Sequence, residues 1–374
     1  MQISSGPYTF LTDFSWVVNS LSGTLTQLDT VKKPFDSMSL NSLNPSTIHL
    51  GEHSIYILSD HSIWSCGEMA NGRLGHPVPD GATVMGKLTK IENIPLISQI
   101  AVHPTGRHVL AVTIAGALMS WGDGEYGQTG HGLKESIEKP RLVQTTQGIE
   151  FIKIAAGKSH SAAITRSGEL YTWGCGKNGL LGHAVGTGLD HADVTRPKIV
   201  DFFNSKIVDV ACGHHDGHTL AITLEETGLR SVWSWGKDSD GKLGRNCSRE
   251  SPNHLPGLVK FPGNESVQIM EVHCGANFSV ALSANGEIFT WGKGSVIFYQ
   301  FRNFENGRVY TRKSATFSCA CIKVTLHCVK VSDTDSCIMN VALQYTQAKC
   351  CTPTCHFLHK AVLACQNFTN FKNS

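Results

Sequence analysis

The stretch LYTWGCGKNGLLGH, Leu170–His183, decides how this chain folds, because it returns in four other places. LMSWGDGEYGQTGHG occupies Leu118–Gly132, VWSWGKDSDGKLGR occupies Val232–Arg245, and IFTWGKG occupies Ile288–Gly294. A degenerate copy, IWSCGEMANGRLGH, spans Ile63–His76 and has a cysteine where the others have tryptophan. Self-similarity at such a period is the signature of a repeat architecture.

Two landmarks keep the copies in register. The first is the anchor position, which recurs at spacings of 55, 52, 62 and 56 residues: Cys66, Trp121, Trp173, Trp235 and Trp291. The second precedes its anchor by 13 residues in four copies and by 17 in the other: His53, His108, His160, Phe278 and, at the longer spacing, His218. We expect the anchors to be buried between neighbouring units.

Each copy has the pattern of a small antiparallel sheet. Phe151–Ala155 alternates between apolar and polar residues, and Ser161–Thr165 and Glu169–Trp173 follow as strands on either side of a short turn. The Gly-rich stretch is a loop, and Arg196–Val200 completes a set of four strands. Four short strands in roughly fifty to sixty residues is the size of one β-propeller blade. The sequence therefore predicts an all-β chain with almost no helix.

These residues carry a family resemblance. The pattern W-G-x-G-x-x-G-x-x-G-H-G, with A-x-G-x-x-H-S upstream, resembles the regulator of chromosome condensation repeat family, which implies a seven-bladed propeller. Within that family, Ile100–His108, Cys66–Gly75 and Ser167–Gly174 are similar to blades of the giant HERC-type ubiquitin ligases. We therefore expect an incomplete seven-bladed propeller of about four to five blades.

The repeat covers only part of the chain. We expect an irregular segment at residues 1–31, blades at 32–294, and a Cys-rich tail at 295–374 that is disordered or the product of truncation or splicing. Only one of the 37 glycines, Gly307, follows Gly294, whereas eight of the 13 cysteines do.

Composition limits the classes of function. The formal net charge of +2 makes no strong case for nucleic acid, which favours a basic face. No apolar run approaches the ~20 residues of a membrane helix, and the first thirty residues contain no Lys or Arg, unlike a secretory leader. Single cysteines scattered through the repeats suit a reducing compartment. We expect a protein of the cytoplasm or the nucleus, without a membrane partner.

Two motifs resemble cofactor-binding sites, but a structural role explains each of them better. Gly122–Gly127 and Gly174–Gly179 match the dinucleotide-binding G-x-G-x-x-G, but they recur once per copy and lead into no helical pattern, so turn glycines with positive φ explain them better. The in-register histidines lie on different blades, and we expect each to hydrogen-bond a loop carbonyl. We therefore predict no bound cofactor.

Metal ligands are possible in two places. His214-His215-Asp216 is a weak local cluster, and the tail has an irregular Cys/His cluster: Cys319, Cys321, His327, Cys328, Cys350, Cys351, Cys355, His356 and His359. Zinc modules usually show two ligand pairs at short, regular gaps. We expect neither group to bind metal tightly, although a genuine zinc module in the tail stays open.

Partner-binding residues are expected in loops, which a rigid sheet scaffold positions on one face. The acids of the Gly-rich loops, Asp123, Glu125 and Asp240, are candidates, as are Asp190, His191 and Asp193 in the long loop Ala184–Val194. For that loop, a simple spacer is an equal alternative.

No catalytic residues stand out, so whether the chain is part of an enzyme stays open. The HERC resemblance implies a protein-interaction propeller that recruits ubiquitination substrates or regulators. The alternative is a guanine-nucleotide exchange factor for a small GTPase, the activity of the family's founding member. No HECT-type module with a thioester cysteine is recognisable in the tail.

Overall fold

A computed structural model of the 374-residue chain describes residues 45–77, 82–184, 192–214, 216–247, 252–261, 267–284 and 288–292. It also describes strands at residues 8–11, 16–19, 24–27, 38–39, 315–319, 322–330 and 337–345. Two compact units divide the chain: residues 43–284 with 289–298, and residues 1–42 with 285–288 and 299–374.

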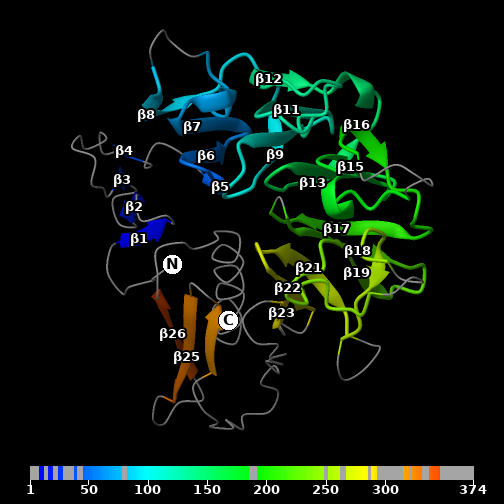
Figure 1. Ribbon diagram of the computed structural model, residues 1–374. Coiled ribbons are helices and arrows are strands. Elements are labelled where there is room, and N and C mark those ends of the chain that lie inside the picture. The colour runs from blue at the N-terminus through cyan, green and yellow to red at the C-terminus, as the bar shows by residue number, and fades with distance from the viewer. Residues whose placement is uncertain are drawn as a thin grey trace. The chain divides into compact units, whose positions relative to one another are not determined.

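The first unit consists of antiparallel sheets that follow one another along the chain. Four have four strands, which pair in sequence order, and the fifth has three described strands (Figure 1). Blade 1 contains β5 (Pro45–Gly51), β6 (Ser54–Ser59), β7 (Ser62–Glu68) and β8 (Val84–Lys90). Blade 2 contains β9 (Ile97–Val102), β10 (His108–Thr113), β11 (Leu118–Gly122) and β12 (Ile137–Leu142). Blade 3 contains β13 (Phe151–Ala156), β14 (His160–Thr165), β15 (Leu170–Gly174) and β16 (Val194–Ile199).

The last two blades continue the same order. Blade 4 contains β17 (Lys206–Cys212), β18 (His218–Leu224), β19 (Arg230–Gly236) and β20 (Gly257–Leu258). Blade 5 contains β21 (Ile269–Cys274), β22 (Phe278–Ser283) and β23 (Ile288–Gly292). The only helical elements in the described chain are three single 3₁₀ turns, η1 (Ala70–Gly72), η2 (Gln144–Thr146) and η3 (Lys177–Gly179). The prediction of all-β blades is therefore confirmed, and any fourth strand of blade 5 after residue 292 lies outside the described residues. No helix in the described part is long and apolar enough to cross a membrane.

The hydrophobic core is divided among the interfaces between blades. Each of four apolar clusters combines one face of a blade with the next blade's anchor tryptophan, and Trp121, Trp173, Trp235 and Trp291 are each at most 3% exposed. The cluster between blades 2 and 3, for example, places Leu110 with Trp173. The anchors are therefore buried between neighbouring blades, as the repeat predicts. Cys66, at the anchor position of blade 1, is also fully buried.

A buried carboxylate joins the first strands of three blades. Asp209 of β17 is 4% exposed, and its Oδ1 pairs with Lys153 Nζ of β13 at 2.6 Å. Its Oδ2 accepts the Val272 backbone N–H of β21 at 3.0 Å. Because one carboxylate satisfies donors from both neighbours, it fixes the spacing of blades 3, 4 and 5.

The second unit contains strands where the sequence predicted irregular chain. β1 (Tyr8–Leu11), β2 (Trp16–Asn19), β3 (Thr24–Gln27) and β4 (Met38–Ser39) form one antiparallel sheet. β24 (Ala315–Cys319), β25 (Ile322–Lys330) and β26 (Cys337–Tyr345) form another. Strands β1 to β3 thus lie in the segment that was expected to be irregular and β24 to β26 lie in the Cys-rich tail, while the expected division of the chain into three segments stays a prediction. The alternation of Ile322, Val324 and Leu326 with polar residues was the overlooked signal.

Candidate functional site

The loops that the sequence singled out share one end of the blades. In a four-stranded antiparallel sheet, the connection between strands one and two and the connection between strands three and four leave from the same end. We call these the inner loops and the Gly-rich loops, and we call the surface that they form the loop face. The inner loops also touch one another, since Glu52 N donates to the Gly106 carbonyl at 3.3 Å and Lys158 N to the Gly213 carbonyl at 3.1 Å.

A chain of hydrogen bonds, the interblade relay, crosses from blade 2 to blade 3 next to this face. His108 Nε2 lies 2.8 Å from Ser161 Oγ, and that hydroxyl donates to the Gln128 carbonyl at 2.8 Å. The same carbonyl accepts the indole N–H of Trp173 at 2.7 Å. His108 and Gln128 belong to blade 2, and Ser161 and Trp173 to blade 3, so the relay ties a Gly-rich loop to its neighbour.

The relay is repeated at the next two interfaces. Between blades 3 and 4, His160 Nε2 lies 3.0 Å from Thr219 Oγ1, and Thr219 and Trp235 both donate to the Leu180 carbonyl, at 2.8 and 2.9 Å. Between blades 4 and 5, His218 Nε2 lies 2.5 Å from Ser279 Oγ, and Ser279 and Trp291 both donate to the Lys242 carbonyl, at 2.8 and 2.9 Å.

The relay determines the protonation of its histidines. Because each hydroxyl donates to a carbonyl, it must accept from Nε2–H, so the proton of a neutral imidazole is on Nε2. The Nδ1 atoms of His108 and His218 are enclosed and have no partner among the described residues. Burial lowers the pKa of both imidazoles to about 3. The sequence analysis predicted a direct hydrogen bond from each histidine to a loop carbonyl. In the relays this prediction is wrong, because a hydroxyl of the next blade lies between the histidine and the carbonyl.

This geometry also excludes the relay as a catalytic pair. His108 and Ser161 resemble a base and a nucleophile, but both are fully buried, and the hydroxyl proton already points to the Gln128 carbonyl. A nucleophile needs access to substrate and a base that accepts its proton. The relay is structural.

The first interface departs from this pattern. Val109 occupies the hydroxyl position of blade 2, and His53 of blade 1 is exposed with a φ of 53°. The Arg73 carbonyl takes the place of the Gln128 carbonyl and accepts Trp121 Nε1 at 3.0 Å. The second donor to the Arg73 carbonyl is Tyr56 Oη, which also belongs to blade 1, at 2.7 Å, so no histidine takes part.

A second set of bonds braces the Gly-rich loops of blades 1 to 4, each within its own blade. In blade 3, Thr172 Oγ1 donates to the Leu181 carbonyl at 2.7 Å and lies 3.1 Å from His183 Nε2. The equivalent bonds in the other blades join a serine before the anchor to a residue ten positions after it: Ser65 to His76, Ser120 to His131, and Ser234 to Arg245. The sequence analysis missed these residues, although their constant offset from the anchor was visible.

Glycine is required where the Gly-rich loop meets the next blade. Gly130 has a φ of 82°, and a Cβ there would lie 2.9 Å from Nε1 of Trp173. Gly182 repeats the arrangement against Trp235, at 2.8 Å. These contacts and positive φ values explain the glycine pattern, and the residues after Gly122 continue to β12 without an α-helix.

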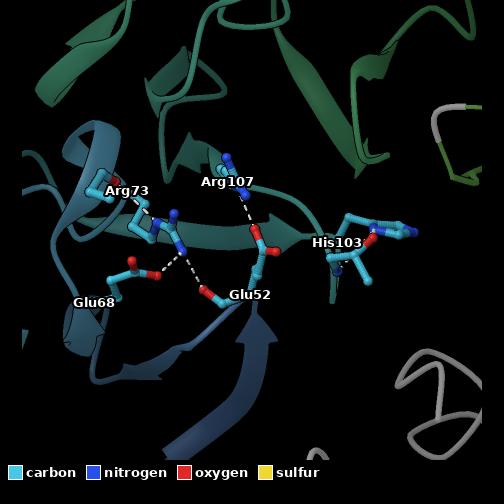
Figure 2. A network of polar contacts seen from close by, with 7 residues as sticks. Glu52, Glu68, Arg73, His103 and Arg107 are labelled. Carbon is cyan, nitrogen blue, oxygen red and sulfur yellow. Dashed lines mark hydrogen bonds and ion pairs between the residues drawn. The ribbon is translucent and has the colours of Figure 1, made fainter. Parts of the chain in front are cut away.

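A polar network joins the Gly-rich loop of blade 1 to the inner loops of blades 1 and 2 (Figure 2). Arg73, 2% exposed, donates from Nη1 to the Glu52 carbonyl at 2.6 Å and to Glu68 Oε2 at 2.9 Å, and Arg107 Nε pairs with the Glu52 carboxylate. Burial raises the pKa of Glu52, but the hydrogen bond and charge of Arg107 outweigh it and hold that pKa below its usual value.

Asp123 continues this network into the Gly-rich loop of blade 2. Its N–H donates to the Arg107 carbonyl at 2.9 Å, and its Oδ1 accepts Glu125 N at 3.0 Å. The Glu125 side chain is exposed. Asp123 therefore shapes the loop that presents Glu125 to solvent. Glu68, two residues after its anchor like Asp123, is an equivalent acid that the sequence analysis overlooked.

The structure gives Asp193 and Asp240 local roles. Asp193 Oδ2 accepts Lys134 Nζ at 2.7 Å, and Oδ1 accepts Gly176 N at 3.0 Å, so this carboxylate joins two Gly-rich loops. Asp240 has a φ of 61° and occupies the left-handed turn position held by asparagines 71 and 178 in other blades. It is thus not equivalent to Asp123. Asp190 and His191 lie outside the described residues.

In the inner-loop cluster His214-His215-Asp216, the two described residues, His214 and Asp216, contact different groups. Asp216 faces lysines, with Oδ1 3.3 Å from Lys177 Nζ and Oδ2 3.8 Å from Lys237 Nζ, whereas the His214 ring lies 6.2 Å from the ring of His103. The part of the chain with described side chains holds no group of three or more metal-ligating residues. His215 and the side chains of the Cys-rich tail lie outside it.

Comparison with known proteins identifies the repeat. Residues 115–164, 167–222 and 231–282 match the regulator of chromosome condensation (RCC1) repeat, and residues 151–180 and 271–296 match a second model of that repeat.

Relatives and a solved structure agree with the repeat. E3 ubiquitin-protein ligase HERC2 of Homo sapiens is 36% identical over 266 residues, which are 71% of this chain and 5% of HERC2. The ultraviolet-B receptor UVR8 of Arabidopsis thaliana is 30% identical over 70% of this chain and 56% of its own length. The chain thus spans a small part of HERC2 and about half of UVR8. Yeast RCC1 (Prp20), solved bound to Kap60, superposes with a TM-score of 0.60 at 18% identity over 87% of this chain and 78% of that chain. The chain is an RCC1 repeat protein, and its blades have the fold of the RCC1 propellers.

Proposed function

We propose that the chain is a protein-interaction propeller of a HERC-type ubiquitin ligase, which recruits substrates or regulators through its loop face. The observation that carries the proposal is the construction of that face. Relays tie three Gly-rich loops to the next blade, and a second set of bonds braces them, while charged side chains such as Glu125 stay exposed. Rigid loops lose little conformational entropy on binding and therefore favour recognition.

The identity of 36% to part of HERC2 supports the ligase context, and transfer of ubiquitin itself would require parts of such a ligase that lie outside these blades. Yeast RCC1 was solved bound to a protein, Kap60, which supports protein as the partner class. All five described repeat cysteines are free, which supports the cytoplasm or nucleus as the compartment.

A photo-crosslinking experiment tests the loop face. A crosslinking amino acid at position 125 should capture a partner protein that the same residue at position 226, in the exposed turn between β18 and β19 at the other end of blade 4, does not. Binding of the purified partner should then weaken with Glu125→Lys and not with the matched control Glu226→Lys. Equal capture from both positions would contradict the proposal.

A guanine-nucleotide exchange factor is the second candidate. Its specific support is the exposed Glu125 on a loop fixed by Asp123, because a presented carboxylate could compete with a nucleotide for its magnesium ion. Release of a fluorescent guanine nucleotide from a panel of small GTPases would measure this activity. Acceleration by the wild type, lost in Glu125→Gln, would favour exchange over recruitment.

A further inference from the structure

The inner loops of blades 2, 3 and 4 meet at a group of residues that takes no part in the relays or in the bracing of the Gly-rich loops. His103 lies on the inner loop of blade 2, Lys158 on that of blade 3, and His214 on that of blade 4. The His103 and His214 rings are 6.2 Å apart at 69°. The Lys158 loop lies between them, since Lys158 N bonds the Gly213 carbonyl and a Cβ on Gly106 would lie 3.1 Å from the Gly157 carbonyl.

His103 presents a donor at this point. Its Nδ1 accepts the Thr105 N–H at 3.2 Å, so in the neutral ring the proton is on Nε2. The side chain is only 6% exposed, and no described residue accepts a hydrogen bond from Nε2. Figure 2 shows the ring pointing away from the Arg107–Glu52 pair. Nε2 is not among the enclosed side-chain atoms that lack a partner, so it reaches solvent from an otherwise buried ring and can donate to an external acceptor.

The same bond disfavours a metal ion between the two rings. A metal bound at His103 Nε2 would need the proton on Nδ1, where Thr105 N–H already points. The surrounding charge is also of the wrong sign for a cation. Burial lowers the pKa of His103 well below its ordinary value, and the Lys158 ammonium acts in the same direction, so a positive charge lies near the ring.

We propose that His103, Lys158 and His214 form an anion subsite that receives a carboxylate or phosphate group from a partner's side chain. Nε2–H of His103 donates the oriented hydrogen bond, and Lys158 supplies the charge. Charge-assisted bonds of this kind are the stronger ones in proteins. The subsite rests on the proposed function, because it names the chemistry of the group that a partner inserts among the inner loops.

Small probes can test the subsite without the partner. The full chain, labelled with ¹⁵N in its histidines, is titrated with blocked tripeptides that have aspartate, phosphoserine or asparagine at the centre, and the His103 ring nitrogens are followed by NMR. His103→Phe assigns the signal. The aspartate or phosphoserine peptide should shift it saturably, and the asparagine peptide should not. A larger response to one of the two anions identifies the source of the group.

Two matched variants complete the test. Lys158→Met should weaken binding about threefold or more, whereas Lys206→Met, in the exposed start of β17, should leave it unchanged. An unshifted His103 signal in the folded wild type, an equal response to asparagine, or an unaffected Lys158→Met variant would each overturn the subsite. Crosslinking from position 125 could still succeed in those cases, so failure of the subsite is distinguishable from failure of the proposed function.

Discussion

The interface between blades 1 and 2 and the interface between blades 2 and 3 share one backbone acceptor and differ in the side chains around it. Both bury an anchor tryptophan whose indole donates to a Gly-rich loop carbonyl, Trp121 to Arg73 and Trp173 to Gln128. The later interface adds a hydroxyl and a neutral histidine from opposite blades, whereas the first has Val109 and a tyrosine from its own blade. Both interfaces thus have a Gly-rich loop carbonyl that accepts two hydrogen bonds. The second donor comes from the same blade as the carbonyl in one interface and from the next blade in the other.

The largest expected effect is loss of an anchor. Trp173→Ala removes a fully buried indole and leaves the Gln128 carbonyl with one donor, so we expect the free energy of unfolding to fall by about 3–5 kcal/mol. Urea denaturation followed by circular dichroism would measure it. The half-buried Trp233, substituted in the same way, provides the control and should cost less.

Acid should weaken the interfaces that contain a relay histidine more than it weakens the interface between blades 1 and 2. His108 and His218 are neutral in the folded chain, with pKa values of about 3, and regain the ordinary value of about 6.5 on unfolding. The unfolded state therefore binds more protons between these values, and stability is lost as the pH falls below about 6.5. From pH 7 to pH 5 each histidine should cost about 2 kcal/mol.

Denaturation of the wild type at both pH values, beside His108→Gln and His218→Gln, checks this. Glutamine keeps an N–H donor but does not titrate, so each variant should lose about 2 kcal/mol less on acidification. His53→Gln, in the exposed position of blade 1, is the matched control and should behave like the wild type. Equal acid losses in all four proteins would contradict the neutral relay.

Removal of the relay hydroxyl should have a smaller effect. Ser161→Ala leaves the buried His108 Nε2–H without an acceptor, so we expect a loss of about 1–3 kcal/mol. The same denaturation assay measures it. A loss below about 0.5 kcal/mol would mean that the histidine finds another acceptor.

Features whose residues lie within one repeat copy could be predicted from the sequence, and features that join residues of two copies could not. The anchors were predictable because each repeats in register with a glycine-rich loop in its own copy. The relay was not, because His108 and Ser161 are 53 residues apart and pair only after two blades stack. Its trace in the sequence is modest: the residue directly after the second landmark has a hydroxyl in three blades, Ser161, Thr219 and Ser279, and is Val109 in blade 2.

The candidate site was predictable as a face and not residue by residue. Glu125 lies exposed in its loop as expected, whereas Asp193 and Asp240 are explained by loop bracing and turn geometry. Of the inner-loop group around His103, the sequence analysis noted only His214, as part of a weak metal-ligand cluster. Its members come from three blades at positions that are not equivalent, so no periodic pattern could bring them together.

The smallest effect gives the sharpest test of the comparison between interfaces. A carbonyl oxygen has two lone pairs, and those of Arg73 are already taken by Trp121 and Tyr56. Val109→Ser would place a hydroxyl where later blades have one, but it would find no free lone pair, and the chain would also lose buried apolar surface. We therefore expect Val109→Ser to destabilise the chain by about 1 kcal/mol, and Tyr56→Phe to cost a similar amount by removing one donor. In the double variant the serine can replace the lost tyrosine donor, as Ser161 does at the Gln128 carbonyl. A double-mutant cycle by urea denaturation should then show a combined loss smaller than the sum of the two single losses by about 0.5–1 kcal/mol. Simple additivity would mean that the second donor to Arg73 is not interchangeable between blades, and that the two interfaces differ in backbone geometry as well as in side chains.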